Sequence, residues 1–230
     1  MIHSFLMIGQ SNMAGRGHLD QIRPVENPRI LKLVNGRFRQ AFNPINFDRW
    51  FSGISLAETF AELYSKDFDA DVGLIPCADG GTCLDEWEVG GLLYDHAVMQ
   101  AKLAMRSSEI KGILWHQGES DTRPDQYPFY TDKFLRIIHS LRRDLDLPDT
   151  PWIVGGLGDY LKDNHRDPRY ANYSLINEQL QKIVTSELHM AYVSAEGLTC
   201  NPDLLHFNLE SCREFGRRYY EAYRRLTAAG

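Results

Sequence analysis

Short apolar runs alternate with longer helical patterns along most of this 230-residue chain. The apolar runs have the length of buried β-strands, and the segments between them repeat their apolar residues at helical spacing. The predicted strands cover residues 5–8, 72–76, 112–116, 152–156 and 190–193. Alternation of this kind is typical of a parallel sheet with helices on both faces. We therefore predict one α/β domain over residues 1–230, with a mainly five-stranded parallel sheet.

Local signals place several boundaries around this framework. Ser55-Leu56-Ala57-Glu58 has the pattern of a capping box and predicts the start of a helix. Asn35-Gly36, between two apolar stretches, predicts a β-hairpin with a tight primed turn. We expect further helices at 92–106, 127–144, around 176–184, and at 209–226, and surface loops at 43–48 and 164–170.

Polar and small residues follow the predicted strands at one edge of the sheet. The tails are Gly9-Gln10-Ser11-Asn12, Gly80-Gly81-Thr82 and His116 to Asp121, with Gly155-Gly156 and Ser194-Ala195-Glu196 after the last two strands. Ligand sites of such sheets lie at the carboxyl ends of the strands. Ser11 stands between turn-permissive glycines, which suits a nucleophile at a strand-to-helix turn. The alternative is a serine that only caps the helix.

A nucleophilic serine needs a base and a group that orients the base. Asp203 and His206 are three residues apart in a predicted loop before the last helix. At this spacing the carboxylate can accept from one imidazole nitrogen while the other faces the serine. A helix-start aspartate and a surface histidine are the alternative for this pair taken alone.

Acyl transfer also needs donors for an oxyanion, and loss of one donor costs about 3–4 kcal/mol of barrier. The candidates are the backbone N–H of Ser11, a backbone N–H of Gly80 or Gly81, and the side-chain amide of Gln117. The two glycines are also compatible with a tight turn alone, and Gln117 with a structural amide at a strand end.

Four blocks of the sequence together resemble the SGNH-hydrolase superfamily. They are Gly9–Gly17 (GQSNMAGRG), Gly80–Thr82 with Trp87, Trp115–Asp121 (WHQGESD) and Asp203–His206. Within that superfamily they resemble the sialate O-acetylesterase and family 6 carbohydrate-esterase branch. The resemblance implies a flavodoxin-like three-layer α/β/α fold and ester hydrolysis without a metal or other cofactor. It also implies Ser11 as nucleophile, His206 as base and Asp203 as its partner. The third block has Gln117 where the superfamily usually has an asparagine donor.

Several residues near these blocks have supporting roles or more than one candidate role. Gln10, Asn12, Glu119 and Asp121 are expected to contact substrate or to support the Ser11 turn, and the two carboxyl groups are also candidate general acids. Trp87 is a candidate for stacking on a sugar, or a packing residue. His116 and His18 are candidates for a polar rim. Four cysteines, at 77, 83, 200 and 212, are expected to be free thiols and not nucleophiles.

Composition narrows the class of partner. The formal charge is −6, and the arginines near the C-terminus are expected to form a solvated helix face, so nothing favours nucleic acid. No apolar run is long enough to span a bilayer, and no signal peptide is visible, which favours a cytoplasmic location for the chain as numbered. The cysteine spacing fits no zinc pattern. Oligomeric state cannot be inferred from the sequence.

Taken together, these features predict a serine-dependent O-acetylesterase acting on acetylated carbohydrate, of sialic acid or xylan type. Activity is expected to rise as His206 loses its proton. The alternatives are a lipid- or thioester-hydrolysing enzyme with the same fold, and a catalytically silent sugar-binding protein.

Overall fold

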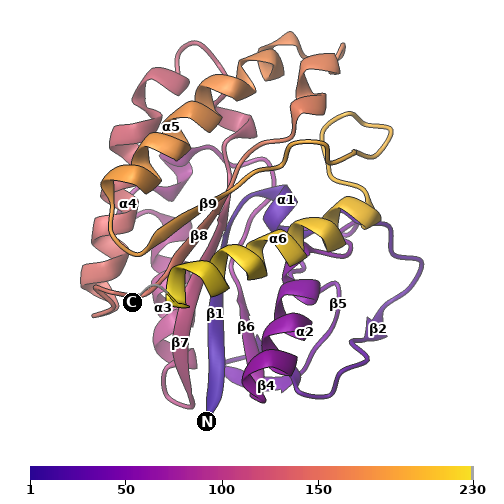
Figure 1. Ribbon diagram of the computed structural model, residues 1–230, viewed down its shortest axis with the longest axis vertical. Helices are drawn as coiled ribbons and strands as arrows, with labels where there is room; N and C mark the ends of the chain where they lie inside the picture. Colours follow the sequence, from indigo (N-terminus) through magenta and orange to yellow (C-terminus); the bar gives the residue numbers. More distant parts are fainter. Residues whose placement is uncertain (229–230) are drawn as a thin grey trace.

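A seven-stranded sheet crosses the centre of the computed structural model, which describes residues 1–228 (Figure 1). Its strand order is β4-β3-β6-β1-β7-β8-β9. The bounds are β1 Ile2–Gly9, β3 Ile30–Val34, β4 Arg37–Gln40, β6 Val72–Pro76, β7 Ser108–His116, β8 Trp152–Gly155 and β9 Met190–Val193. All neighbours are parallel except β3 and β4. The five predicted strands are β6, β1, β7, β8 and β9, and they form the flavodoxin-like order. Residues 229 and 230 of the predicted domain lie outside the described residues.

The β3–β4 hairpin extends the sheet at one edge. Asn35 and Gly36 have φ angles of 50° and 72°, as the predicted primed turn requires. Val34 pairs with Arg37 directly across that turn. A separate two-stranded ribbon joins β2 (Arg23–Pro24) to β5 (Phe42–Asn43).

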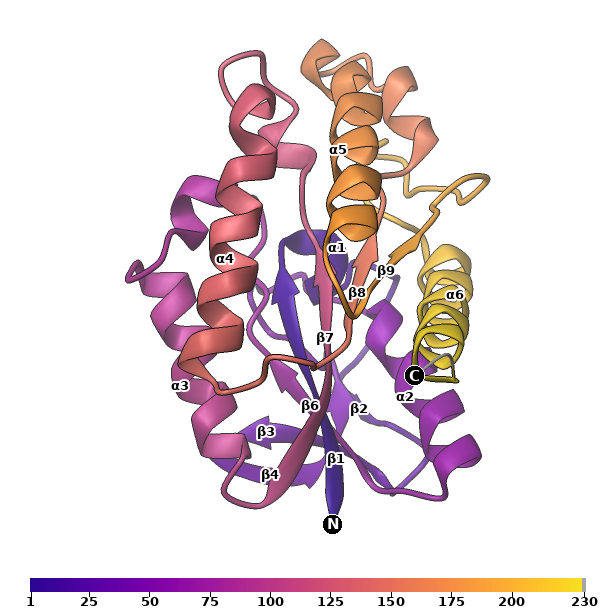
Figure 2. The same cartoon turned by 60° about the vertical axis from the view of Figure 1, so that its left-hand side comes forward.

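Helices cover both faces of the sheet, which confirms the three-layer prediction (Figures 1 and 2). One face carries α2 (Leu56–Phe68) and α6 (Leu209–Ala228), and the other carries α3 (Leu92–Ala104), α4 (Tyr130–Asp144) and α5 (Tyr173–Ser186). In β1, Phe5 and Met7 pack under the first pair, while Leu6 and Ile8 pack under the other three. This alternation follows from the two-residue period of a strand that is buried on both faces. None of the helices within residues 1–228 is long and apolar enough to cross a membrane.

Short 3₁₀ helices lie in several of the loops that connect the strands and α-helices. Their bounds are η1 Leu84–Trp87, η2 Glu119–Asp121, η3 Tyr127–Phe129, η4 Asp159–Asp163 and η5 Pro168–Asn172. They account for the first residues of the helix expected from 127 and for part of the expected loop at 164–170.

Two local predictions were wrong in part. Ser55 caps α2 by accepting from the backbone N–H of Ala57, but the Glu58 carboxylate accepts from the Asn43 amide at 2.7 Å, away from Ser55. The segment 43–48 is not a simple surface loop, because Asn43, Ile45 and Asn46 are buried. Tertiary contacts decide both outcomes, and they are not visible in local patterns.

Candidate active site

Ser11 lies in a sharp turn between β1 and the short helix α1 (Ser11–Ala14). Gly9 has a φ of +129°, and a Cβ there would lie 2.1 Å from the carbonyl oxygen of His116 in β7. Gly15, after α1, has a φ of +108°, and a Cβ there would collide with the Ile54 backbone. Only glycine fits these two positions, so the flanking glycines let β1 turn abruptly against its neighbours. The turn leaves Ser11 at the carboxyl edge of the sheet.

The structure brings Ser11, His206 and Asp203 into one hydrogen-bonded chain. The Oγ atom of Ser11 is 3.0 Å from Nε2 of His206, and Nδ1 of His206 is 2.7 Å from Oδ2 of Asp203. A carboxylate only accepts hydrogen bonds, so its partner Nδ1 carries the hydrogen. Nε2 is then the nitrogen that accepts from the serine hydroxyl. These spacings are the ones that a serine nucleophile, a histidine base and an orienting carboxylate would require.

Asp203 is held in its ionised form by its own loop. Its Oδ1 accepts from the backbone N–H groups of Leu205 and His206 at 2.9 and 3.0 Å. Partial burial opposes ionisation, but the His206 side chain and these two N–H groups outweigh it and lower the pKa of Asp203 to about 2. The carboxylate therefore keeps its negative charge beside His206 at any pH near neutrality.

Gln10 and Asn12 support the Ser11 turn from both sides. The Gln10 side-chain oxygen accepts from the backbone N–H groups of Gly118 and Ser120. Asn12 donates to the Glu119 carboxylate at 2.5 Å and to the carbonyl of Leu205, and it accepts from the N–H of Phe207 at 3.0 Å. Asn12 thus connects the serine turn to the loop that carries His206. Both side chains are buried, so they support the turn and do not contact solvent.

Glu119 forms a buried pair with His116 beneath the site. Its Oε1 lies 3.2 Å from Nε2 of His116, and both residues are buried. Burial alone raises the pKa of Glu119, but His116 and the Asn12 amide outweigh it and lower that pKa. The role of His116 as a polar rim is therefore wrong, because its ring is enclosed between Phe207 and Phe215.

The expectation that Gln117 offers a free oxyanion donor is contradicted. Its Nε2 already donates to the carbonyl of Thr82 at 3.1 Å and to Asp121 at 2.5 Å, and the side chain is fully buried. An amide nitrogen has only two hydrogens, so neither is left for a substrate. Burial is also the main reason that the pKa of Asp121 is raised, to about 6. Gln117 and Asp121 thus form a structural pair that also fixes Leu84, whose N–H donates to Asp121.

Gly80 is next to Ser11, but its backbone N–H is also occupied. A Cβ on Gly80 would be 3.4 Å from the Cβ of Ser11. The Gly80 N–H donates to Oδ2 of Asp48 at 2.9 Å, which contradicts a free donor at this position. By contrast, the N–H groups of Ser11 and Gly81 have no acceptor within residues 1–228. Of the two candidate backbone donors, the Gly81 N–H is therefore available to a ligand and the Gly80 N–H is not.

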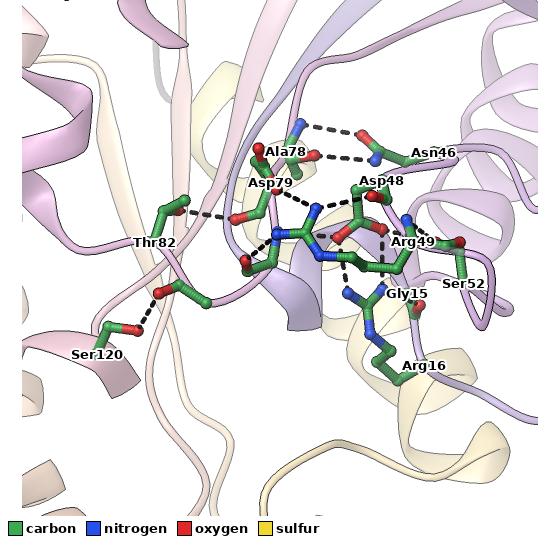
Figure 3. Close-up of polar contacts among 12 residues, drawn as sticks. Gly15, Arg16, Asn46, Asp48, Arg49, Ser52, Ala78, Asp79, Thr82 and Ser120 are labelled. Atoms are coloured by element: carbon green, nitrogen blue, oxygen red, sulfur yellow. Dashed lines mark hydrogen bonds and ion pairs between the residues drawn. The ribbon is translucent and has the colours of Figure 1, made fainter. Parts of the chain in front are cut away.

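A buried ion pair clamps the Gly80 loop to the end of the serine turn (Figure 3). Arg16 donates from both terminal nitrogens to Asp48, at 3.1 and 2.7 Å, and Asp48 also accepts from the Ser52 hydroxyl at 2.7 Å. Burial opposes the ionisation of Asp48, but its contacts with Arg16, Ser52 and the Gly80 N–H outweigh burial and lower the pKa of Asp48. Arg16 lies within the Gly9–Gly17 block, but no sequence pattern indicates Asp48 as its partner.

Further contacts to the His206 loop were also missed by sequence reasoning. Tyr160 and Asn164 donate to the carbonyls of Leu205 and Leu204 at 3.2 and 3.0 Å. Asn201 donates to the carbonyl of Arg16 at 3.0 Å. These residues stand in loops without local periodicity, so only the tertiary structure reveals them.

Trp87 packs inside the protein, which contradicts a role in stacking on a sugar. It is fully buried against Trp115, and its Nε1 donates to the Thr82 hydroxyl at 3.1 Å. His18 is exposed and pairs with Asp20. The four cysteines are free thiols as expected, and burial raises the pKa of Cys212 to about 12. Within the described residues, no cluster of three His, Cys, Asp or Glu side chains is arranged to hold a metal ion.

The chain belongs to the family of carbohydrate esterases described as sialic acid-specific acetylesterases, whose model matches residues 1–225. It is thus a carboxylic ester hydrolase of the carbohydrate-esterase class. A probable carbohydrate esterase of Arabidopsis thaliana is 32% identical over an aligned length of 245 residues. The alignment covers 95% of this chain and 89% of that protein. A solved structure from Arabidopsis thaliana matches with a TM-score of 0.86 and 30% identity, over 97% of this chain and 98% of its own. The structure of NanS matches with a TM-score of 0.78 at 18% identity, over 100% and 98% of the two chains, and supports the fold.

Proposed function

We propose that this protein removes acetyl groups from acetylated sugars by a Ser-His-Asp mechanism. The observation that carries the proposal is the chain Ser11 Oγ–His206 Nε2–Asp203, with spacings of 3.0 and 2.7 Å. Membership of a carbohydrate acetylesterase family supplies the class of substrate.

The first half-reaction forms an acetyl-enzyme. Nε2 of His206 takes the hydroxyl proton of Ser11 while Oγ attacks the acetyl carbonyl carbon. The carbonyl oxygen becomes an oxyanion and accepts from the N–H groups of Ser11 and Gly81. The tetrahedral intermediate then collapses, the bond to the sugar oxygen breaks, and that oxygen takes the proton from His206.

The second half-reaction releases acetate. His206 takes a proton from water, whose oxygen attacks the acetyl carbon. The bond between that carbon and Ser11 Oγ then breaks, and Oγ takes the proton from His206. Asp203 remains an anion in both halves and stabilises the imidazolium that forms. A deacetylated sugar and acetate are the products.

The proposal is tested by hydrolysis of 4-nitrophenyl acetate and by acetate release from acetylated sugars. Ser11→Ala is expected to abolish both activities. Ser194→Ala is the matched control, because Ser194 also follows a strand of the sheet but is exposed. Equal rates for wild type and Ser11→Ala contradict the nucleophile. A strong preference for long-chain esters over the acetate contradicts the acetylesterase and points to the lipid-hydrolysing alternative.

A further inference from the structure

Large aromatic side chains project from the loop formed by residues 46–53, which we call the aromatic loop. Trp50 is 86% exposed, Phe47 66% and Phe51 50%. Trp50 is the most exposed aromatic side chain among residues 1–228. Exposed apolar clusters of this kind commonly mark a site of interaction. The aromatic loop thus needs an explanation that the catalytic residues do not give.

The aromatic loop is fixed beside the Gly80 loop. Asn46 donates to the Ala78 carbonyl at 2.9 Å and accepts from the Ala78 N–H at 3.0 Å. Arg49, the neighbour of Trp50, donates to the Gly80 carbonyl at 2.8 Å. Figure 3 shows these contacts joining the two loops, together with the Asp48 clamp. Trp50 is therefore carried on a backbone that is held against the residues next to Ser11.

A cavity borders the same loop. It has a volume of about 590 Å³, and Phe47, Asp48 and Asp79 contribute to its wall. Ile22, Phe42 and Leu93 make much of the remaining wall apolar. Small-molecule sites typically have this size and are mainly apolar with a few polar groups. The cavity gives space beside the aromatic loop for more than the acetyl group.

The charges on this side of the site are paired with one another. Arg16 is engaged by Asp48 and Arg49 by Asp79, each at 2.7 Å. Lys32, in the cavity wall, donates to the carbonyls of three residues, Phe42, Pro44 and Ile45, and burial lowers its pKa to about 8. Because the terminal nitrogens of Arg16, the Arg49 guanidinium and the Lys32 ammonium already have oxygen partners, a carboxylate on the ligand would compete with them. The electrostatics of this side favour an uncharged ligand.

We propose that Trp50 stacks on a pyranose ring of the substrate, and that this substrate is an uncharged acetylated oligosaccharide. The inference rests on the proposed function and names the substrate class for the same site. The C–H face of a pyranose is apolar and flat enough to cover an indole, whose large face supplies binding area with little side-chain entropy lost. The stacking contact lies away from the reacting carbonyl and is retained from the ground state to the transition state. Its loss is therefore expected to raise KM and to leave kcat unchanged.

The test measures acetate release from O-acetylated xylooligosaccharides and hydrolysis of 4-nitrophenyl acetate by wild type, Trp50→Ala and Phe129→Ala. Phe129 is the matched control, since it is 56% exposed but lies in η3, outside the aromatic loop. Trp50→Ala is expected to raise KM for the oligosaccharide about tenfold, a loss of about 1.4 kcal/mol. It should leave kcat and the rate on 4-nitrophenyl acetate unchanged, and Phe129→Ala should change none of these values.

Four results would overturn the inference, and they can be told apart. An unchanged KM for the oligosaccharide in Trp50→Ala removes the stacking role and leaves the proposed function intact. A higher kcat/KM of wild type for O-acetylated sialic acid than for the xylooligosaccharides removes the uncharged substrate class. Hydrolysis of 4-nitrophenyl acetate without acetate release from any sugar removes the carbohydrate function itself. A change in the size-exclusion mass of Trp50→Ala with unchanged sugar kinetics identifies the aromatic loop as a contact between copies of the chain.

Discussion

The buried Arg16–Asp48 pair offers the sharpest test of how this site is held together. The side chains of Arg16 and Asp48 are only 5% and 3% exposed. Asp48→Asn keeps the shape of the side chain and removes its negative charge. The guanidinium of Arg16 then remains buried without a counter-charge, and breaking a buried pair in this way costs about 3–5 kcal/mol. We expect the lower end of that range, because an asparagine oxygen can still accept one of the hydrogen bonds.

Urea denaturation measures this change as a shift of the midpoint with an unchanged slope. Asp85→Asn is the control, because it breaks the more exposed ion pair of Asp85 with Lys133 and should change the stability much less. The double variant Arg16→Met/Asp48→Asn removes both charges, and it should be more stable than the sum of the two single changes predicts. Strictly additive effects, or a loss below about 1 kcal/mol for Asp48→Asn, would refute the argument that the pair acts as a buried unit.

The same substitution also has a kinetic consequence. Asp48 accepts from the Gly80 N–H, and Gly80 adjoins both Ser11 and Gly81. Weaker anchoring of this loop displaces the Gly81 donor that we assign to the oxyanion, so kcat should fall more than KM rises. Measurement on 4-nitrophenyl acetate isolates this effect, since that ester has no sugar to contact the aromatic loop. A changed KM with an unchanged kcat would contradict the assigned role of the loop.

Three further predictions concern single positions. Asp203→Asn should lower kcat by roughly 10⁴-fold without unfolding the protein, as measured with 4-nitrophenyl acetate and circular dichroism. Because the pKa of Asp203 is about 2, this carboxylate stays ionised near neutral pH, and the wild type should lose activity only where the imidazole base becomes protonated. A pH–rate profile that is flat in that range would contradict a histidine base. Asp121→Asn should stabilise the protein near neutral pH by about 2–3 kcal/mol and have no effect near pH 3. The reason is that the pKa of this carboxyl is raised to about 6 in the fold, so at pH values above its unfolded pKa of about 3.9 its ionisation favours the unfolded chain. Urea titrations at the two pH values check the sign. Gly9→Ala should lose activity and fold stability together, since its Cβ would lie 2.1 Å from the His116 carbonyl oxygen, and a wild-type thermal midpoint in this variant would disprove the strain.

Much of the fold was predictable because local sequence patterns determine it. Each predicted strand is a continuous apolar run, and such runs are what a strand buried on both faces requires. Parallel strands also end at a common edge, so the polar tails could be assigned to one site before any contact was known. Ser11 was found in this way, while Asp203 and His206 were found from their three-residue spacing before the last helix, and the structure places all three within hydrogen-bond reach.

The proposed oxyanion donors could not be predicted in the same way, because a donor is useful only if nothing else accepts its hydrogen. Whether the Gly80 N–H is free depends on Asp48, which lies 32 residues away in the sequence. The Gln117 amide is used by Asp121, four residues away, and by the carbonyl of Thr82. Thr82 follows β6, so it meets Gln117 only after β6 and β7 have been placed on either side of β1. The choice between stacking and packing for Trp87 had to wait for a related reason, because burial depends on the packing of the whole layer and not on neighbouring residues.

The position of the proposed base His206 relative to the proposed nucleophile Ser11 has the same dependence on distant contacts. Ser11 and His206 are 195 residues apart, and Asp-x-x-His alone contains no information on where its loop will lie. The contacts of Asn12 supply that information. This side chain follows Ser11 directly, accepts from the Phe207 N–H on the far side of His206 and donates to the Leu205 carbonyl on the near side. The residues on both sides of the base are thereby tied to the residue next to the nucleophile. These hydrogen bonds connect the Ser11 turn directly to the loop that carries His206, and Ser11 Oγ and His206 Nε2 lie 3.0 Å apart.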